Sequence, residues 1–200
     1  DRAGLGDRLL QQLVRTGAAV TLAYTTSDAA SDAPPTFAQA ENGSFTLDPM
    51  QPDHFRRLLA ALGGEPLAGV VHLWSLDAPA GDVDAQTLTQ AAAEANAGAL
   101  HLVQALAAQE AQTPPRLWFV TRGAQSAPAG GDLPAVSQSP LWGLAQAVTL
   151  EHPELQLVVV DLDGANRQAG DAADADVRPL LAELLTPDDE DRSAWRAGER

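Results

Sequence analysis

The chain opens with Asp1-Arg2-Ala3-Gly4-Leu5-Gly6, a glycine turn of the kind that precedes a helix. Such a turn can bind a pyrophosphate, because backbone amides and the positive end of the helix dipole face the anion. Asp1 and Ala3 oppose that chemistry: they put a carboxylate and a methyl group where a binding turn has glycine. We therefore expect a degenerate turn, formed by Asp1, Ala3, Gly4 and Gly6, that binds no cofactor.

Reductases that protonate an alkoxide commonly use a tyrosine whose hydroxyl is tuned by a nearby lysine. This chain has no lysine, since all 12 basic residues are arginines, and its one tyrosine is Tyr24. Tyr24 ends an expected strand and has no partner at the usual spacing. The sequence therefore predicts that this segment has no reductase chemistry of its own.

Other chemistries lack their usual residues. Without cysteine, the chain has no disulfides, no thiolate catalysis and no cysteine-ligated zinc. A Walker loop needs lysine, and no Gly-x-Ser-x-Gly elbow occurs. The triplet Asn96-Ala97-Gly98, which follows a strand in many short-chain dehydrogenases, lies here within a helical stretch, so we expect it to pack a helix. The four histidines are scattered singly without metal-ligand spacing, and we expect them to be structural: His54, His72, His101 and His152.

Composition limits the partners. With 27 acidic against 12 basic residues, the formal net charge of -15 repels nucleic acid and anionic lipid, so neither is an expected partner. No apolar run approaches the ~20 residues that span a bilayer. The absence of cysteine is compatible with a reducing cytoplasm, which is the expected location.

Apolar runs alternate with helical stretches, which predicts an α/β fold: a Rossmann-like, three-layer arrangement with a mostly parallel sheet, truncated relative to a full short-chain dehydrogenase. The expected strands are Ala19 to Tyr24, Gly69 to Trp74, Arg116 to Thr121 and Leu155 to Leu162. The expected helices are Leu5 to Thr16, Pro52 to Leu62, Ala85 to Gln109 and Pro140 to Glu151.

Polar stretches separate these elements. Thr25 to Ser44 and Ala124 to Gln138 have the composition of mobile surface loops. Asp163 to Asp176 is a third polar stretch, before a short helix over Val177 to Leu185 and an acidic turn, Pro187 to Asp191. No compositional break divides residues 1–200, so we expect a single subdomain, cut from a much larger chain, whose first strand precedes Asp1.

Four segments carry a resemblance to a known family. They are Val70 to Asp77 (VVHLWSLD), Leu117 to Ala124 (LWFVTRGA), Ser139 to Gln146 (SPLWGLAQ) and Leu150 to Pro153 (LEHP). Together they resemble the structural subdomain of modular type I polyketide synthase ketoreductases, which is similar to the corresponding region of animal-type fatty acid synthases. The edges fit too, since Trp195 to Arg200 resembles the segment that leads out of that subdomain.

In that family, two Rossmann-like halves form the ketoreductase, and this chain resembles the first, supportive half. The resemblance places Trp142 at the position of the active tyrosine, Gln146 near its amide partner, and Arg122-Gly123 in the serine region. A tryptophan has no acidic hydroxyl with which to protonate an alkoxide. We expect no catalytic, cofactor or metal residues, and structural or interface roles for Trp74, Asp77, Arg122, Trp142 and Glu151.

The resemblance implies a non-catalytic scaffold within a polyketide synthase. Its partners would be the catalytic ketoreductase subdomain of the same chain, which binds NADPH and reduces β-ketoacyl thioesters on an acyl carrier protein, and neighbouring synthase domains. Two alternatives stay open. One is a diverged, active nucleotide-binding reductase, and the other is a pseudo-ketoreductase that spaces synthase domains.

Overall fold

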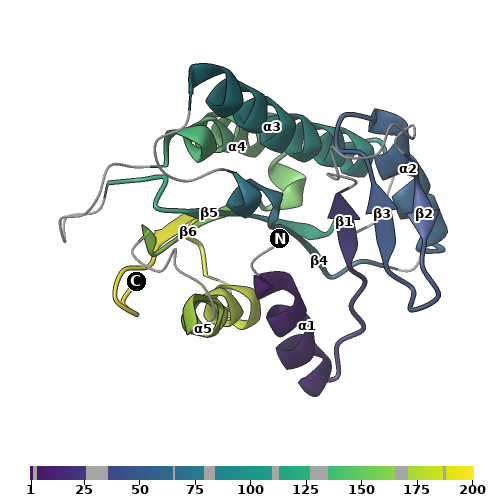
Figure 1. Ribbon diagram of the computed structural model, residues 1–200. Coiled ribbons are helices and arrows are strands. Elements are labelled where there is room, and N and C mark those ends of the chain that lie inside the picture. Colours follow the sequence, from purple (N-terminus) through teal and green to yellow (C-terminus); the bar gives the residue numbers. More distant parts are fainter. Residues whose placement is uncertain are drawn as a thin grey trace.

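The computed structural model describes residues 1, 4–25, 36–64, 66–78, 84–109, 113–126, 135–164, 171–186 and 188–200. Its main element is a four-stranded sheet in the order β4-β5-β6-β7 with every pair parallel. The strands are β4 (Gly69–His72), β5 (Arg116–Arg122), β6 (Val158–Leu162) and β7 (Arg192–Ala194). The expected Rossmann-like α/β fold is therefore confirmed (Figure 1).

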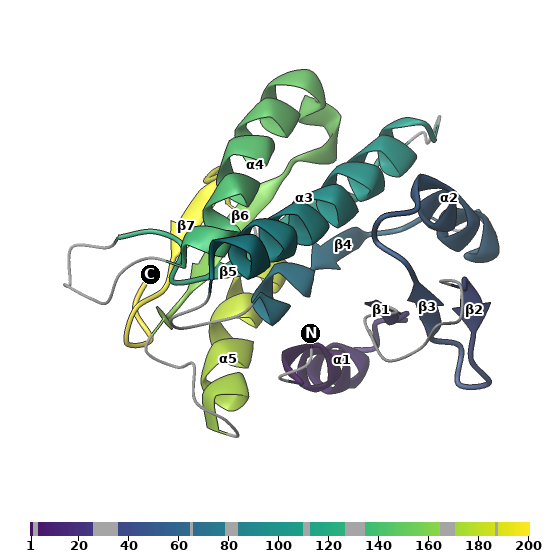
Figure 2. The same cartoon turned by 45° about the horizontal axis from the view of Figure 1, so that its top comes forward.

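Helices cover both faces of this sheet. α3 (Ala85–Ala107) and α4 (Ser139–Glu151) pack together on one face, and α1 (Leu5–Arg15) and α5 (Asp171–Leu185) on the other (Figures 1 and 2). Strand alternation divides β5 between the two faces: Leu117 and Phe119 join the core under α3 and α4, whereas Trp118 and Val120 join the core under α1 and α5. No helix in the described ranges is both long and apolar enough to cross a bilayer.

A separate three-stranded sheet lies beside β4. It has the order β1-β3-β2, with β1 (Ala23–Thr25) parallel and β2 (Ala38–Gln39) antiparallel to β3 (Phe45–Leu47). α2 (Pro52–Ala61) follows it and packs against α3. The expectation of one sheet was thus too simple, because the two sheets share no ladder among the described residues.

Several expected boundaries were wrong. Strand β1 is shorter than Ala19 to Tyr24, and the expected strand ending at Trp74 stops at His72, because Trp74–Asp77 form a 3-10 helix, η1. A second 3-10 helix, η3 (Pro153–Leu155), takes the start of the expected strand Leu155 to Leu162. Proline fixes the backbone for a helical turn there, and Gln156, with φ 44, then turns the chain toward β6.

The expected loops contain structure. β2 lies inside the stretch Thr25 to Ser44, and a 3-10 helix, η2 (Val136–Gln138), with buried Ser137 and Gln138, ends the stretch Ala124 to Gln138. The helix expected from Val177 begins earlier, at Asp171. The sequence did not reveal this start, because residues 171–176 (DAADAD) show no apolar period. The middle parts of these loops, Pro187, Arg2 and Ala3 lie outside the described residues.

Candidate functional site

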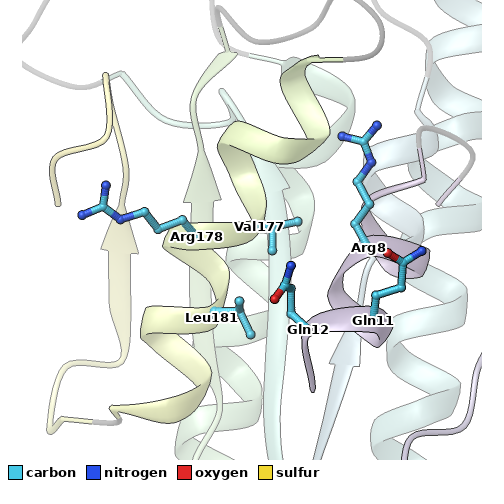
Figure 3. Close-up of a pocket in the computed structure, with 6 residues that line it drawn as sticks. All are labelled: Arg8, Gln11, Gln12, Val177, Arg178 and Leu181. Carbon is cyan, nitrogen blue, oxygen red and sulfur yellow. The ribbon is translucent and has the colours of Figure 1, made fainter. Parts of the chain in front are cut away.

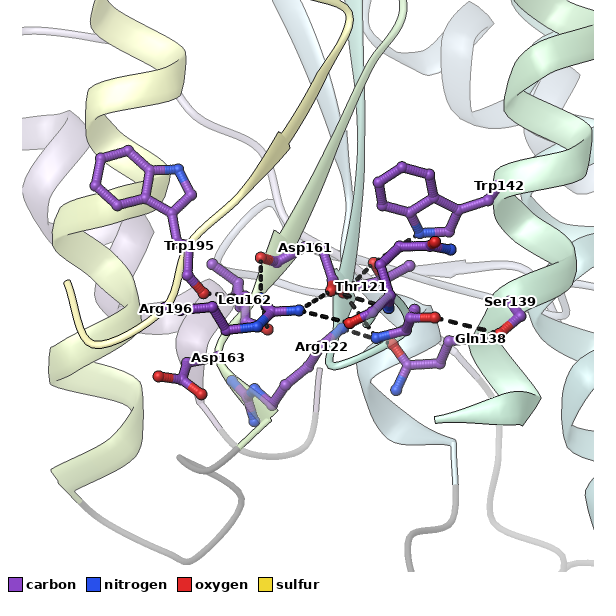
Figure 4. A network of polar contacts seen from close by, with 12 residues as sticks. Thr121, Arg122, Gln138, Ser139, Trp142, Asp161, Leu162, Asp163, Trp195 and Arg196 are labelled. Atoms are coloured by element: carbon purple, nitrogen blue, oxygen red, sulfur yellow. Dashed lines mark hydrogen bonds and ion pairs between the residues drawn. The ribbon is translucent and has the colours of Figure 1, made fainter. Parts of the chain in front are cut away.

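The carboxyl ends of β5 and β6 form the edge at which open α/β sheets bind their ligands. Thr121 lies opposite Asp161 across this pair of strands, and both side chains are fully buried. A network of polar contacts spreads from them to α4 and to the segment after β7 (Figure 4). This edge is therefore the candidate functional site.

Asp161 is the centre of the network. Its carboxylate accepts hydrogen bonds from the Thr121 hydroxyl at 2.7 Å and from the backbone N–H groups of Ala124 at 2.9 Å and Gln125 at 3.2 Å. The guanidinium of Arg196 is 2.6 Å from Asp161 Oδ2, the oxygen that also accepts from Gln125. The structure therefore satisfies this buried carboxylate from within the chain.

Arg196 lies over the end of the sheet (Figure 4). Besides Asp161 Oδ2, it donates to the carbonyl oxygens of Asp161, Leu162, Trp195 and Gln125, at distances between 2.8 and 3.2 Å. A turn with positive φ at Ala197 and Gly198 returns the chain, and the Ala197 N–H donates to Asp163 at 2.8 Å. The segment after β7 thus covers the edge that an open site would present to a ligand.

Trp142, which the resemblance places where the family has its active tyrosine, joins the network from α4. Its indole Nε1 donates to Thr121 Oγ1 at 3.1 Å, and the Thr121 hydroxyl donates onward to Asp161. Neither group is acidic enough to protonate an alkoxide, and the hydroxyl proton is directed at a carboxylate. These two hydrogen bonds connect α4 to the carboxyl ends of β5 and β6.

Arg122 ends β5 and is buried, as an ion pair with Asp176 of α5. Its backbone N–H donates to the Gln138 side chain at 2.9 Å. Arg122 therefore connects β5 to α5 through Asp176 and to η2 through Gln138, contacts that are consistent with the structural role expected for it.

In the opening turn, the Asp1 carboxylate binds the backbone amides at the start of α1. Asp1 accepts from the backbone N–H groups of Gly6 at 2.8 Å and Leu5 at 3.3 Å, and Gly4 adopts φ 81. These amides at the start of α1 are the donors that a pyrophosphate would need. The residues present do not fit a dinucleotide phosphate, because Asp1 has taken the donors and would repel the anion.

Tyr24 also has a carboxylate partner. Its hydroxyl donates to Asp7 at 3.0 Å, and burial, together with this bond and the charge of Asp7, raises the pKa of Tyr24 above its usual value. A catalytic lysine would act in the opposite direction. The raised pKa keeps the Tyr24 hydroxyl protonated, and its partner Asp7 belongs to α1, not to α4.

The other singled-out residues lie elsewhere. Trp74 is partly buried, and its Nε1 donates to the Ala23 carbonyl of β1 at 3.2 Å. Asp77 ends η1, while Glu151 and Gln146 are exposed on α4, so the structure does not bring these three into the network. The triplet around Asn96 lies inside α3, as expected, and a Cβ at Gly98 would lie 3.2 Å from both Pro49 and the Trp74 ring.

The described part of the chain has neither a metal centre nor a groove with converging charges that could compete with this edge. No group of three or more histidine, aspartate or glutamate side chains there could hold a metal ion. A groove between α1 and α5 is lined by Arg8, Gln11, Gln12, Val177, Arg178 and Leu181. The side chains of Arg8 and Arg178 extend in different directions, so they do not converge on a ligand (Figure 3).

Comparison with known proteins assigns the family. Residues 20–200 match the family described as "Polyketide synthase extender module SpnB, Rossmann fold domain". The chain belongs to this family. The resemblance of this Rossmann-fold domain to the structural subdomain of polyketide synthase ketoreductases is confirmed.

Curated relatives are far longer than this Rossmann-fold domain. A mycocerosic acid synthase-like polyketide synthase of Mycolicibacterium smegmatis is 33% identical over 150 residues, which are 71% of this chain and 6% of the relative. The pikromycin polyketide synthase component PikAII of Streptomyces venezuelae is 42% identical over 83 residues, 42% of this chain and 2% of the relative. The domain therefore spans a small fraction of these proteins.

Solved structures support the fold. A C2-type ketoreductase from a modular polyketide synthase matches with a TM-score of 0.55 and 26% identity, over 91% of this domain and 40% of that chain. An adenylation, ketoreductase and pseudo Asub structure of a keto acid-selecting NRPS module matches with a TM-score of 0.78 and 22% identity, over 99% and 15%. The second likeness is one of fold alone.

Sequence reasoning missed the residues that hold the network together. Thr121, Asp161 and Asp176 were read only as parts of a strand or a polar stretch, and Arg196 only as part of an exit segment. The available indication was a polar residue within an apolar strand, Asp161 after three valines, because a buried carboxylate must find partners.

Proposed function

We propose that this Rossmann-fold domain is the non-catalytic scaffold half of a polyketide synthase ketoreductase. In this role it stabilises a catalytic half of the same polypeptide, which binds NADPH and reduces β-ketoacyl thioesters on an acyl carrier protein. The observation that carries the proposal is the closed carboxyl edge. There Asp161, Arg196, Thr121 and Trp142 satisfy one another and offer no proton donor of suitable acidity.

The opening turn supports the same proposal. A dinucleotide site needs free amides at the helix start, and Asp1 accepts from two of them. The diverged reductase therefore lacks both a phosphate cradle and a proton donor in the described residues. The spacer alternative differs only in lacking an active catalytic partner, and reconstitution of reductase activity with a catalytic half distinguishes the two.

The outer face of α3 and α4 is the surface that best fits the catalytic half. Leu100 on α3 is 39% exposed, and Leu150 on α4 is 79% exposed. Small exposed residues flank them at helical spacing, which lets another helix approach closely: Ala93 on α3, and Gly143 and Ala147 on α4. We therefore assign the pairing surface to this face.

Titration calorimetry with NADPH tests the lack of a cofactor site. We expect no binding tighter than about 1 mM, because Asp1 occupies the amides and the net charge of -15 opposes a polyanion. A matched titration of the catalytic half should give ordinary saturable binding. Micromolar affinity in this domain alone would contradict the proposal and favour a diverged reductase.

A further inference from the structure

The turn between β2 and β3 contains two neighbouring residues that can react with each other. It comprises residues 40–44, and in it Asn42 is followed by Gly43, with both residues exposed. Glycine has no Cβ, so nothing hinders attack of its backbone nitrogen on the side-chain amide carbon, Cγ, of the asparagine before it. The turn therefore carries the two groups that spontaneous deamidation requires.

Water is the one co-reactant of this chemistry. Gly43 N, after losing its proton, attacks Asn42 Cγ; the new N–Cγ bond closes a succinimide ring as the Cγ–Nδ2 bond breaks, and the leaving nitrogen takes up a proton and departs as ammonia. Water then adds to one of the two ring carbonyls and opens the ring. Opening at Cγ gives aspartate, whereas opening at the backbone carbonyl gives isoaspartate, in which the main chain runs through the side-chain carbon.

The folded turn engages both reacting groups. The Gly43 N–H donates to the Ala40 carbonyl at 2.9 Å, which opposes loss of the proton from the attacking nitrogen. Asn42 Oδ1 accepts from the Ser44 N–H at 3.1 Å and from the Ser44 hydroxyl at 2.8 Å, so the side chain that is attacked is held in place. The reaction thus requires this turn to open.

The surroundings of the turn make local opening easy. β2 pairs with β3 through two residues, Ala38 and Gln39, and both are exposed. A Cβ added to Gly43 would meet no atom of the described residues within 4 Å, apart from its chain neighbours, so nothing packs on the tip of the turn. Exposed, weakly paired segments open at low free energy while the core stays folded. Asn42 can therefore react without unfolding of the domain.

Asn96 provides the contrast within the same chain. It is followed by Ala97, whose methyl group hinders attack, and it lies inside α3, where its Nδ2 donates to the Ala92 carbonyl at 2.6 Å. Attack there would require a long, packed helix to unwind. The remaining asparagine, Asn166, lies outside the described residues. Of the two asparagines that the structure describes, Asn42 is thus the reactive one.

We propose that Asn42 is a deamidation site of this domain, and that the hydrogen bonds from Ser44 set the rate by holding the turn closed. Both products add a negative charge beside Glu41. Isoaspartate also lengthens the main chain, which the turn that pairs the Ala40 N–H with the Ser44 carbonyl at 2.8 Å does not accommodate. The inference goes beyond the scaffold role and does not depend on it, because the readout is the chemical state of one peptide.

Incubation of the folded domain at mildly alkaline pH, followed by peptide mass mapping, tests the site. Deamidation at Asn42 should exceed that at Asn96 at least tenfold, because a surface turn opens far more often than a packed helix. The rate at Asn42 should rise with hydroxide concentration, since Gly43 N must lose its proton, and should rise again on unfolding in urea. Equal rates at the two asparagines in the folded domain would overturn the site. A rate at Asn42 that urea leaves unchanged would overturn the protection by the turn.

Ser44→Ala tests the control of the rate. It removes the hydroxyl bond to Asn42 Oδ1 and should speed deamidation of the folded domain about fivefold, the change in an opening equilibrium for one lost hydrogen bond. Thr16→Ala is the matched control: it removes an exposed hydroxyl bond of 2.7 Å to the Leu13 carbonyl and should leave the rate at Asn42 unchanged. In urea, where the turn is absent, wild type and Ser44→Ala should react alike. Equal rates of these two proteins when folded would show that Ser44 does not hold the turn closed.

Discussion

Asp161 and Arg196 form the ion pair on which the carboxyl edge of the sheet depends. The carboxylate is fully buried and Arg196 has only 18% of its side chain exposed. Such a pair is stable because each group has further hydrogen bonds, with Thr121 on one side and several backbone carbonyls on the other. The pair holds the segment after β7 against the ends of β5 and β6.

Arg196→Ala should therefore lower the free energy of unfolding by about 3 to 5 kcal/mol, because it leaves a buried carboxylate without its cation. Denaturant unfolding measures this. Arg192→Ala is the matched control: Arg192 faces Asp191 at 3.8 Å with both side chains about half exposed, so its loss should cost at most about 0.5 kcal/mol. Equal effects of the two substitutions would contradict a closed, self-satisfied edge.

His72 should give the domain a distinctive response to acid. Burial, and after it the positive charge of the amino terminus, lowers the pKa of His72 from 6.5 to about 4. Between these values the unfolded chain binds a proton that the folded chain does not. Stability is therefore present above about pH 6.5 and is lost as the pH falls toward 4, by up to about 1.4 kcal/mol per pH unit.

Unfolding measured between pH 4 and 7 for the wild type and His72→Phe checks this. In that window, the free energy of unfolding of the variant should fall less steeply with decreasing pH, by the contribution of about one proton. Carboxylates contribute alike to both proteins, so the difference reports His72. Parallel curves would mean that His72 is accessible to water in the folded state.

At the scale of elements, the sequence predicted the helices and strands that are long enough to show a periodic apolar pattern. Helices α1, α2, α3 and α4 and strands β5 and β6 carry apolar patterns of sufficient length, and their bounds came within a few residues. Strands β2, β3 and β7 have only two or three residues each, too few for a period to appear. They exist because a neighbouring strand supplies their hydrogen bonds, which is long-range information.

The same limit applies to the site. Trp142 and Arg122 were singled out through a resemblance, whereas their partners Thr121 and Asp176 come from other elements. Arg196 lies 35 positions from Asp161 in sequence, and only the parallel pairing of β6 with β7 brings them together. Local patterns cannot predict contacts that depend on sheet order.

The outer face of α3 and α4 permits a direct test of the pairing surface. Leu150→Glu should leave the unfolding midpoint of this domain nearly unchanged, because Leu150 is 79% exposed, but should weaken binding to the catalytic half at least tenfold by burying a charge. Binding of the separately expressed catalytic half measures it. Leu185→Glu on α5, whose wild-type side chain is 53% exposed, is the control and should bind normally. Normal binding by Leu150→Glu would move the interface elsewhere.

At the scale of the whole molecule, the polar groups suited to a reductase site are already paired with other groups of this chain. The carboxyl edge is closed by Arg196, the helix start by Asp1, and the tyrosine by Asp7. The net charge of -15 further disfavours an anionic cofactor. On the outer face of α3 and α4, the apolar side chains of Leu100 and Leu150 remain exposed to a partner. This distribution is the one expected of a support for another domain.

The most direct measurement is NADPH-dependent reduction of a β-keto thioester by the catalytic half, alone and together with this domain extended at both ends. We expect the catalytic half alone to be less stable and at least tenfold less active. The pair should recover full activity, and a pair carrying Trp142→Phe should match it, because Trp142 takes no part in proton transfer. A catalytic half that is fully active and equally stable alone would contradict the scaffold role and leave the spacer as the better account.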